Sequence, residues 1–253
     1  MIQQVPYCGY APLPGQLLSR FNIDPLLIAA LIVLCAWQFM ALGKNRGSEA
    51  RQHRVYATAG WWIAGMAFIS PLCALSVSLF SARVAQHMVL VLVAAPLVAS
   101  GLPRARASTA SLRLWTSTAI FFICLWFWHM PVPYEATFTS AGVYWAMHVT
   151  LFGSGILLWH ELLDHAPRHT AQALTAGLLT FMHMGLLGAV LALADRPMFQ
   201  WHFLTTQAWG LTPLQDQQLG GTLMWVPGVA LFLWSALRSI ARLWDLMERA
   251  RPA

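Results

Sequence analysis

The chain has 253 residues, of which 58% are hydrophobic and only 9% are charged. Soluble domains carry about 25% charged residues, so this composition excludes an ordinary soluble enzyme and indicates an integral membrane protein. The 15 Lys and Arg residues outnumber the 9 Asp and Glu residues and give a net charge of +6, but most of them stand between apolar segments. We therefore expect a single membrane domain over residues 1–253, in contact with lipid, and no nucleic-acid partner.

Seven apolar segments each approach the ~20 residues that a helix needs to cross the hydrocarbon core. They predict an all-α, polytopic transmembrane bundle of about seven helices over 24–243, after an N-terminal segment 1–23 and before a tail 244–253. Barrel strands are excluded because "LLIAALIVLCAW" is apolar at every position rather than at alternate ones. Pro71 interrupts the second segment and predicts a broken or interfacial stretch as far as Phe80. The predicted spans are 24–42, 55–72, 82–100, 110–129, 143–162, 171–194 and 219–243.

The orientation follows from the basic residues, which short cytoplasmic connections retain during insertion. Alternate connections differ sharply in their content of Lys and Arg, and this predicts an outside N-terminus and a cytoplasmic C-terminus in a multi-pass protein of the cell inner (plasma) membrane. The outer side holds three basic residues: Arg20, Arg83 and Arg196. The cytoplasmic side holds twelve: Lys44, Arg46, Arg51, Arg54, Arg104, Arg106, Arg113, Arg168, Arg238, Arg242, Arg249 and Arg251.

Histidines are concentrated near the predicted outer face. His87 and His148 lie one to two turns inside the third and fifth spans, His129 closes the fourth span, and His183 is near the middle of the sixth. An ionisable group within a membrane span is costly and usually serves a function. We therefore predict that these imidazoles converge and form a metal site. For any single histidine, including His202 in an outer connection, an interhelical hydrogen bond or an interface position is the alternative.

Methionines stand beside several of these histidines, and imidazole with thioether ligands suits copper, above all Cu(I). Adjacent residues point about 100° apart on a helix, so ligands for one ion must come from different helices. Met88 and Met224 are the candidate thioethers, and core packing is the alternative for both. Asp216 shares a face of the seventh span with Met224 and is a further candidate ligand, or else caps or braces that helix. Gly220 and Gly221 predict a close approach of a neighbouring helix to this face.

The remaining motifs indicate no enzyme chemistry. Cys35 and Cys124 are expected to pack within spans, whereas Cys8 and Cys73 fall on the outer side and could form a disulfide or a second copper site. The segment "HELLDH" at 160–165 resembles a zinc-protease motif, but its histidines are five residues apart and cannot chelate one ion from a regular helix. We expect a solvated helix end there.

Four segments resemble the multispan CtaG type of cytochrome c oxidase assembly factor, in that family's order, over about 140 residues. They are "QHMVLVLVAAPLV" at 86–98, "WHMPVPYEATF" at 128–138, "HVTLFGSGILLW" at 148–159 and "DQQLGGTLMWVPG" at 216–228. The resemblance implies an integral membrane protein that assembles a haem-copper oxidase and handles copper for it. Its partners would be cytochrome c oxidase subunits and periplasmic copper chaperones. The family's recurrent polar residues fall on His87, His129, His148, His183, Asp216 and Gln217, and Tyr144 stands where many relatives have a further histidine.

The function predicted from the sequence is a non-enzymatic, membrane-embedded copper-binding factor. It would hold Cu(I) between its helices and deliver the ion from the periplasmic side to a cytochrome c oxidase under assembly. Two alternatives remain: an assembly scaffold that binds an oxidase subunit and no metal, and a membrane cytochrome in which histidine pairs ligate haem iron.

Overall fold

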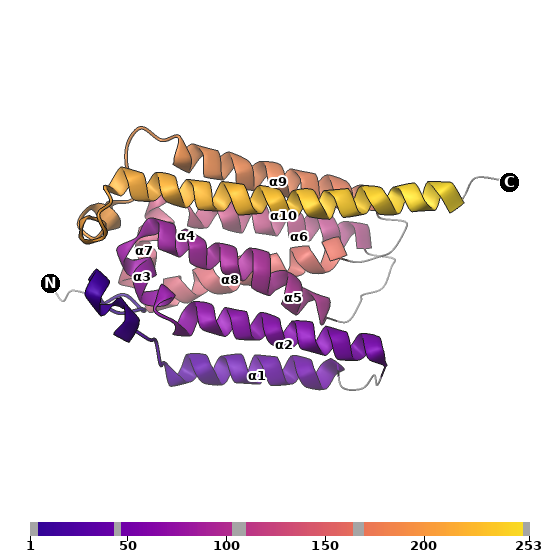
Figure 1. Ribbon diagram of the computed structural model, residues 1–253, viewed down its shortest axis with the longest axis horizontal. Helices are drawn as coiled ribbons and strands as arrows, with labels where there is room; N and C mark the ends of the chain where they lie inside the picture. The colour runs from indigo at the N-terminus through magenta and orange to yellow at the C-terminus, as the bar shows by residue number, and fades with distance from the viewer. Residues whose placement is uncertain (1–4, 43–46, 103–109, 164–169, 250–253) are drawn as a thin grey trace.

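The structure is a computed structural model that describes residues 5–42, 47–102, 110–163 and 170–249, and these residues form helices and connections without a strand. Apolar residues on all sides of each segment favour helices, which satisfy their own backbone hydrogen bonds in lipid. The long helices run side by side along one axis (Figure 1). They are α1 (Pro25–Leu42), α2 (Ser48–Ile69), α6 (Ala110–Trp128), α8 (Ala141–Leu163), α9 (Thr170–Ala192) and α10 (Pro213–Arg249), together with the span that contains the shorter helices α4 (Phe80–Met88) and α5 (Ala95–Ser100).

Shorter elements gather at the end of the bundle that carries the N-terminus, which we call the N-terminal end (residues 5–24, α3, α7 and 195–212). The opposite end, where α1, α5 and α8 end and α2, α6 and α9 begin, is called the basic end because Arg51, Arg54 and Arg113 lie there. The short elements are η1 (Pro14–Ser19), α3 (Leu72–Ser78), α7 (Pro131–Thr139), η5 (Gln200–Phe203) and η6 (Gln207–Trp209). Helix α7 was not expected, because its nine residues were read as a loop; Pro131 begins it at a position where proline favours helix initiation.

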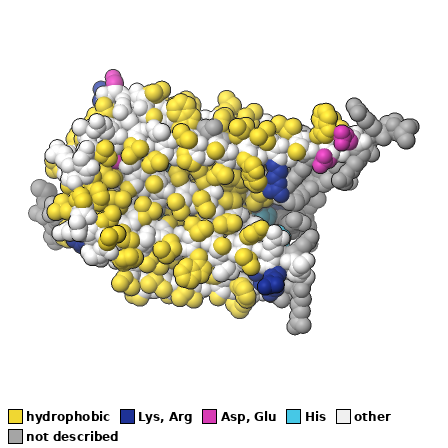
Figure 2. Space-filling view, viewed as in Figure 1, with side chains coloured by type: hydrophobic (Ala, Val, Ile, Leu, Met, Phe, Trp, Pro, Cys, Tyr) yellow, Lys and Arg dark blue, Asp and Glu magenta, His cyan; other side chains and the backbone are white. Residues whose placement is uncertain are grey.

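Five helices of the described residues are long and apolar enough to cross a membrane, or six if α2 and α3 form one span. Helices α2 and α3 meet at an angle of 48°, which confirms the predicted break at Pro71. The seventh predicted span, 219–243, lies on α10, which is not among these helices. That it crosses the membrane therefore stays a prediction, as does the orientation. Hydrophobic side chains cover the visible face along the length of the bundle (Figure 2), as expected for a surface that contacts lipid.

The central element is the continuous span Phe80–Ser100, which consists of α4, the π-helical segment η2 (Val89–Ala94) and α5. It packs against α2, α8 and α10, whereas α1 packs mainly against α2 at the edge of the bundle. π-Helical turns are rare and often mark functional sites. Here the π-helical segment begins directly after His87 and Met88, and Trp159 of α8 donates a hydrogen bond to its Val91 carbonyl at 2.8 Å.

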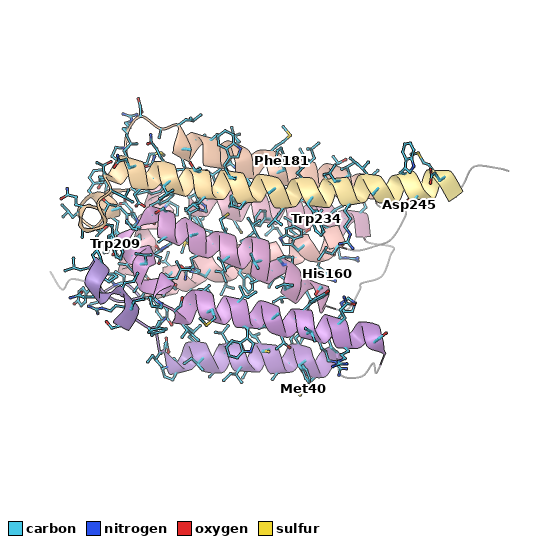
Figure 3. The ribbon with its side chains drawn as sticks, in the orientation of Figure 1. Met40, His160, Phe181, Trp209, Trp234 and Asp245 are labelled. Atoms are coloured by element: carbon cyan, nitrogen blue, oxygen red, sulfur yellow. A yellow bond between two sulfur atoms is a disulfide. The ribbon has the colours of Figure 1, made fainter. Side chains whose placement is uncertain are left out.

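Helix α10 approaches two neighbours closely at its glycines, as the sequence predicts. A Cβ on Gly220 would lie 2.5 Å from the Phe80 ring of α4, and one on Gly221 would lie 2.4 Å from the Ala192 nitrogen of α9. The close approach at Gly220 fixes α10 against the central span, on which the candidate site is built. The two ends of the bundle are marked in Figure 3 by Trp209, at the N-terminal end, and by His160, toward the basic end.

Candidate metal centre

Three histidines from different helices meet inside the bundle. The His87 ring of α4 lies 5.5 Å from the His129 ring, directly after α6, and 5.2 Å from the His148 ring of α8, measured between ring centroids. All three side chains are buried, with at most 3% exposure. The predicted convergence of imidazoles from separate helices is therefore confirmed for His87, His129 and His148.

Backbone hydrogen bonds fix two of these rings. Nδ1 of His129 lies 2.7 Å from the Leu125 carbonyl oxygen, and Nδ1 of His148 lies 3.0 Å from the Tyr144 carbonyl oxygen. A carbonyl oxygen only accepts, so each Nδ1 carries the hydrogen and donates it. Each Nε2 therefore keeps a free lone pair, which is the usual arrangement of a histidine that ligates a metal.

Several polar atoms in and beside this cluster lack a hydrogen-bond partner. They are both ring nitrogens of His87, Nε2 of His129 and of His148, and, on the same helix as His87, Nε of Arg83 and Oε1 of Gln86. Buried polar atoms are hydrogen-bonded in the large majority of cases, so unpaired atoms gathered in one place call for an explanation such as an ion or a water. The gathering of six such atoms is the feature of the molecule that most clearly indicates a ligand.

The rings are close, but they are not aligned as in a loaded site. Among the residues that the structure describes, no group of three or more His, Cys, Asp or Glu side chains is already arranged to hold a metal ion. The donor set suits a metal all the same, since neutral imidazole is the commonest metal ligand in proteins. The His87 ring makes no hydrogen bond, so it can turn without breaking one.

Tyr144 and a disulfide cover the cluster toward the N-terminal end. The Tyr144 ring lies 4.2 Å from the His148 ring, and its hydroxyl lies 3.3 Å from Sγ of Cys8 and 3.6 Å from Sγ of Cys73. Cys8 and Cys73 form a disulfide, which decides between the two alternatives that the sequence left open. Tyr7 stacks on Tyr144 at 4.9 Å, so the N-terminal segment is fixed over the histidines.

Helix α7 and the connection before α10 complete this cover. Nδ1 of His202 donates to the Ser78 carbonyl at 3.2 Å, and its Nε2 accepts a hydrogen bond from the Tyr134 hydroxyl at 2.7 Å. Burial, with a smaller contribution from Arg83, lowers the pKa of His202 to about 3. Both nitrogens are engaged, so His202 is a neutral structural residue in this cover.

Arg83 was counted as an outer basic residue, but it lies within α4 with 1% of its side chain exposed. Its Nη1 donates to the Thr137 hydroxyl of α7 at 2.9 Å, and its guanidinium lies 4.3 Å from the Phe138 ring. Gln86, one residue before His87, donates to the Ala67 carbonyl of α2 at 2.8 Å. Sequence reasoning missed both residues as parts of the site, although a charged residue just inside an apolar span is a signal that could have found Arg83.

His183 lies apart from the other three. Its ring contacts Phe122 of α6 at 4.2 Å, where it lines a narrow space between α6 and α9, and it has no ring contact with the cluster in the described residues. Met88 and Met224 are buried in the hydrophobic core, with 6% and 0% exposure. The structure thus gives both methionines the packing role that was the alternative, and ligation by His183 or by either sulfur stays a prediction.

Asp216 connects α10 with the central span. Its carboxylate accepts hydrogen bonds from the Phe80 nitrogen at 2.6 Å and from the nitrogen and hydroxyl of Ser81, at the first turn of α4. We expected it to cap or brace its own helix if it did not bind metal; instead it caps a different one. A carboxylate at a helix N-terminus satisfies amide hydrogens that have no partner within the helix. Metal binding by Asp216 would compete with these bonds.

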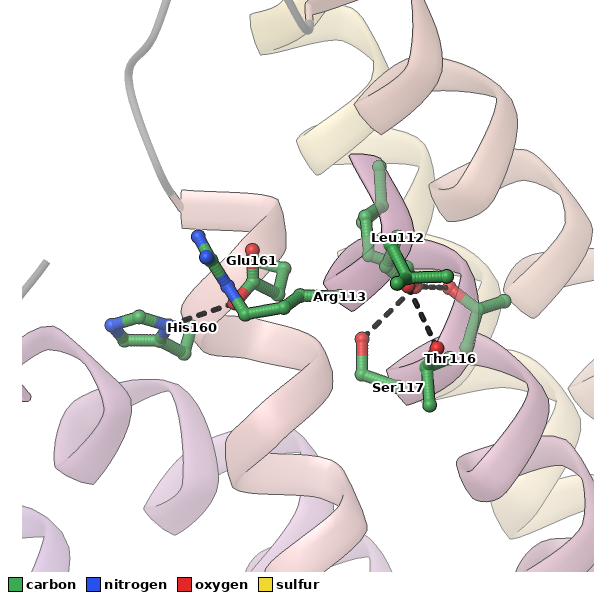
Figure 4. A network of polar contacts seen from close by, with 8 residues as sticks. Leu112, Arg113, Thr116, Ser117, His160 and Glu161 are labelled. Carbon is green, nitrogen blue, oxygen red and sulfur yellow. Dashed lines mark hydrogen bonds and ion pairs between the residues drawn. The ribbon is translucent and has the colours of Figure 1, made fainter. Parts of the chain in front are cut away.

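The end of α8 shows why the zinc-protease resemblance fails. Glu161 forms an ion pair with Arg113 of α6 at 3.0 Å and lies 3.4 Å from Nδ1 of His160 (Figure 4). His165 lies outside the described residues. The carboxylate that would serve as a base in such a motif is therefore engaged in joining α6 to α8 at the basic end.

The geometry of the cluster can be set beside known proteins. The model of the cytochrome c oxidase caa3 assembly factor family matches residues 33–245. The chain belongs to this family. No curated protein and no solved structure matches the chain. The matched range includes the central span, α6 and α8, so the three clustered histidines lie within the part of this assembly factor that the family model covers.

Proposed function

We propose that this assembly factor binds Cu(I) on His87, His129 and His148 and delivers it, from the periplasmic side of the inner membrane, to a haem-copper cytochrome c oxidase under assembly. The single observation that carries the proposal is the set of four unpartnered imidazole nitrogens, contributed by three helical segments and almost fully buried. Membership of an assembly-factor family supports the oxidase as the destination, and imidazole donors are compatible with copper.

The three histidines would have unequal roles. His129 and His148 are oriented by their Nδ1 hydrogen bonds, so their Nε2 lone pairs are held in position to be donated to an ion. His87 has no such bond, so its ring can rotate toward the other two and away again. This arrangement suits an ion that must be held and later released, because the weakest ligand can leave first. Met88 and Met224 remain candidates for exchangeable positions during transfer.

Entry from the N-terminal end would require the cover to move. The disulfide, Tyr144 and Tyr7 lie over His148, and Arg83 lies one helical turn before His87. An opening of this cover, for example when a partner protein binds, would connect the cluster with the periplasm. A closed cover would exclude water and keep Cu(I) from oxidation while it is held.

The test is copper content per chain after purification under anaerobic conditions with ascorbate, compared among the unmodified protein, His87→Gln, His148→Gln and His183→Gln. We expect about one copper in the unmodified protein and in His183→Gln, because the His183 ring lies apart from the cluster, and a loss in the other two. Oxidase activity of the membranes should fall in parallel. Copper near zero in the unmodified protein would overturn the proposal.

The same samples test the alternatives. A scaffold would support oxidase assembly equally well in all four forms, whether or not metal is present. A stoichiometric Soret band in the absorption spectrum would instead indicate a haem-binding cytochrome.

A further inference from the structure

Arg83 is a buried cation without an anionic partner in the described part of the chain. The ion pairs of these residues are formed by Glu161 with Arg113 and with His160, and the buried carboxylate of Asp216 is bound to the first turn of α4. Nε of Arg83 has no hydrogen-bond partner. A charge is costly to bury without a counter-ion, so packing alone does not account for an arginine at this position.

Aromatic rings hold this guanidinium in place. Its carbon ζ lies 4.3 Å from the Phe138 ring and 5.5 Å from each of the Tyr134 and Tyr144 rings. The electron-rich ring faces attract a cation, but they carry no net charge. The full positive charge of Arg83 therefore remains, and because the side chain is buried the charge is poorly screened.

This charge acts on the histidine cluster. Arg83 and His87 are four residues apart on α4 and therefore lie on the same face of the helix. Tyr144 connects the two groups on the other side, because its ring contacts both the guanidinium and the His148 ring, the latter at 4.2 Å. One aromatic ring thus separates the fixed charge from an imidazole ligand.

We propose that Arg83 makes the histidine cluster selective for singly charged metal ions, Cu(I) and its analogue Ag(I), over Cu(II) and Zn(II). This inference rests on the proposed metal site. Three neutral imidazoles alone would bind Cu(II) and Zn(II) well, since imidazole suits both and affinity along the first-row divalent ions peaks at copper. The ligands themselves therefore give no reason for the site to take a monovalent ion. The fixed positive charge does.

The selectivity has a quantitative signature. Repulsion between a fixed charge and an ion is proportional to the charge of the ion. If Arg83 weakens binding of a monovalent ion by a certain factor, it weakens binding of a divalent ion at the same place by the square of that factor. The relation holds whatever the local dielectric constant is, so it needs no estimate of that constant.

The experiment measures dissociation constants of Ag(I), Cu(I), Zn(II) and Co(II) by competition with chelators, on the purified full chain with its disulfide intact. Arg83→Gln removes the charge and keeps a hydrogen-bond donor, Arg83→Lys keeps the charge, and Arg238→Gln removes an exposed arginine at the basic end as a control. We expect Arg83→Gln to bind Ag(I) about tenfold more tightly and Zn(II) about a hundredfold more tightly. Arg83→Lys and Arg238→Gln should keep the selectivity of the unmodified protein.

The failures are distinguishable. If neither the unmodified protein nor Arg83→Gln binds Cu(I) or Ag(I), the proposed function fails and this inference fails with it. If the unmodified protein binds Cu(I), but Arg83→Gln changes no constant or changes the monovalent and divalent constants equally, only the inference about Arg83 is overturned. If Arg83→Gln does not fold, the unmodified protein still decides, because tight binding of Zn(II) beside Cu(I) would contradict the proposal.

Discussion

Two apolar spans of this molecule, α1 and the central span Phe80–Ser100, occupy opposite environments. Over 18 residues of each span, 11% of the residues of α1 are buried within the protein, whereas 72% of those in the central span are. The central span contains Arg83, Gln86 and His87, and the buried polar residue of α1 is Gln38. Ionisable side chains thus lie where protein surrounds the helix, as expected when lipid is the alternative surrounding.

The comparison separates two ways of holding a helix in a bundle. The central span is fixed by close packing and by buried hydrogen bonds on several sides. Helix α1 contacts mainly α2, and what holds it in addition is a small number of specific links: the Cys8–Cys73 disulfide before it and the hydrogen bonds of Gln38 within it. Substitutions at the two kinds of attachment should therefore change the free energy of unfolding by different amounts.

The largest effect should come from the disulfide, which anchors the segment before α1 to α3. Its cysteines are 65 residues apart, so removing the bond in a Cys8→Ser, Cys73→Ser variant should lower the free energy of unfolding by about 4 kcal/mol. Thermal unfolding in detergent measures this loss, with Cys124→Ser as the control. A reductant should destabilise the unmodified protein by a similar amount and leave the double variant unchanged.

Glycine substitutions compare the two helix packings directly. In Gly60→Ala, at the contact of α2 with the central span, the new Cβ would meet backbone atoms, 2.8 Å from the Val98 nitrogen, and we expect a loss of about 2 to 3 kcal/mol. In Gly65→Ala, at the contact of α2 with α1, the nearest atom is Leu31 Cδ1 at 3.6 Å, so helix propensity should give a gain of about 0.5 to 1 kcal/mol. Equal effects in the same denaturation assay would contradict the difference in packing.

Acid should weaken the cover of the histidine cluster through His202. Its pKa is lowered to about 3 in the folded protein, below the usual value of 6.5, so the unfolded chain binds the proton more readily. The contribution of neutral His202 to the free energy of unfolding is fully present above pH 6.5 and is lost as the pH falls toward 3. At pH 5 the loss should be about 2 kcal/mol relative to neutral pH.

His202→Gln provides the comparison for that measurement. The variant should be less stable at neutral pH, because it loses the bonds to Ser78 and Tyr134, but its stability should fall less between pH 7.5 and pH 5. Unfolding curves at both pH values for both proteins isolate the contribution of this residue. Identical slopes would show that the other buried groups account for the whole pH dependence.

The smallest effect is expected for the polar link within α1. Gln38 donates to the Val98 carbonyl at 2.8 Å and accepts from the Trp61 indole at 2.6 Å. Hydrogen bonds between membrane helices contribute about 0.6 kcal/mol on average, so Gln38→Leu should cost about 1 kcal/mol in the unfolding assay. A loss as large as that of the disulfide variant would mean that α1 is held mainly through Gln38.

Much of the fold could be predicted from the sequence because apolar length is a local property. The predicted spans 24–42, 110–129 and 143–162 agree with α1, α6 and α8 to within two residues, and Pro71 marks the break between α2 and α3. Helix α7 was not predicted, because its nine residues of mixed polarity show no helical periodicity. The π-helical segment η2 also escaped, since its backbone depends on how the span packs rather than on its apolar residues.

The candidate site could be predicted only in part. Depth along each span identified His87, His129 and His148, but depth does not give the rotation of a helix, and rotation turned His183 toward Phe122 and Asp216 toward α4. The same limitation hid Arg83, which a count of charges placed in a connection and which the structure places inside a ring of aromatic side chains.

The amino-acid sequence by itself determined that this chain is a helical membrane protein of the oxidase assembly-factor family, because apolar length and motif order need no knowledge of contacts. The tertiary structure alone decided which imidazoles meet, which of their nitrogens are free, and that a buried cation lies one helical turn away. The physical reason is that ligation and electrostatic repulsion depend on distances between side chains of different helices, which packing sets and which no single segment encodes.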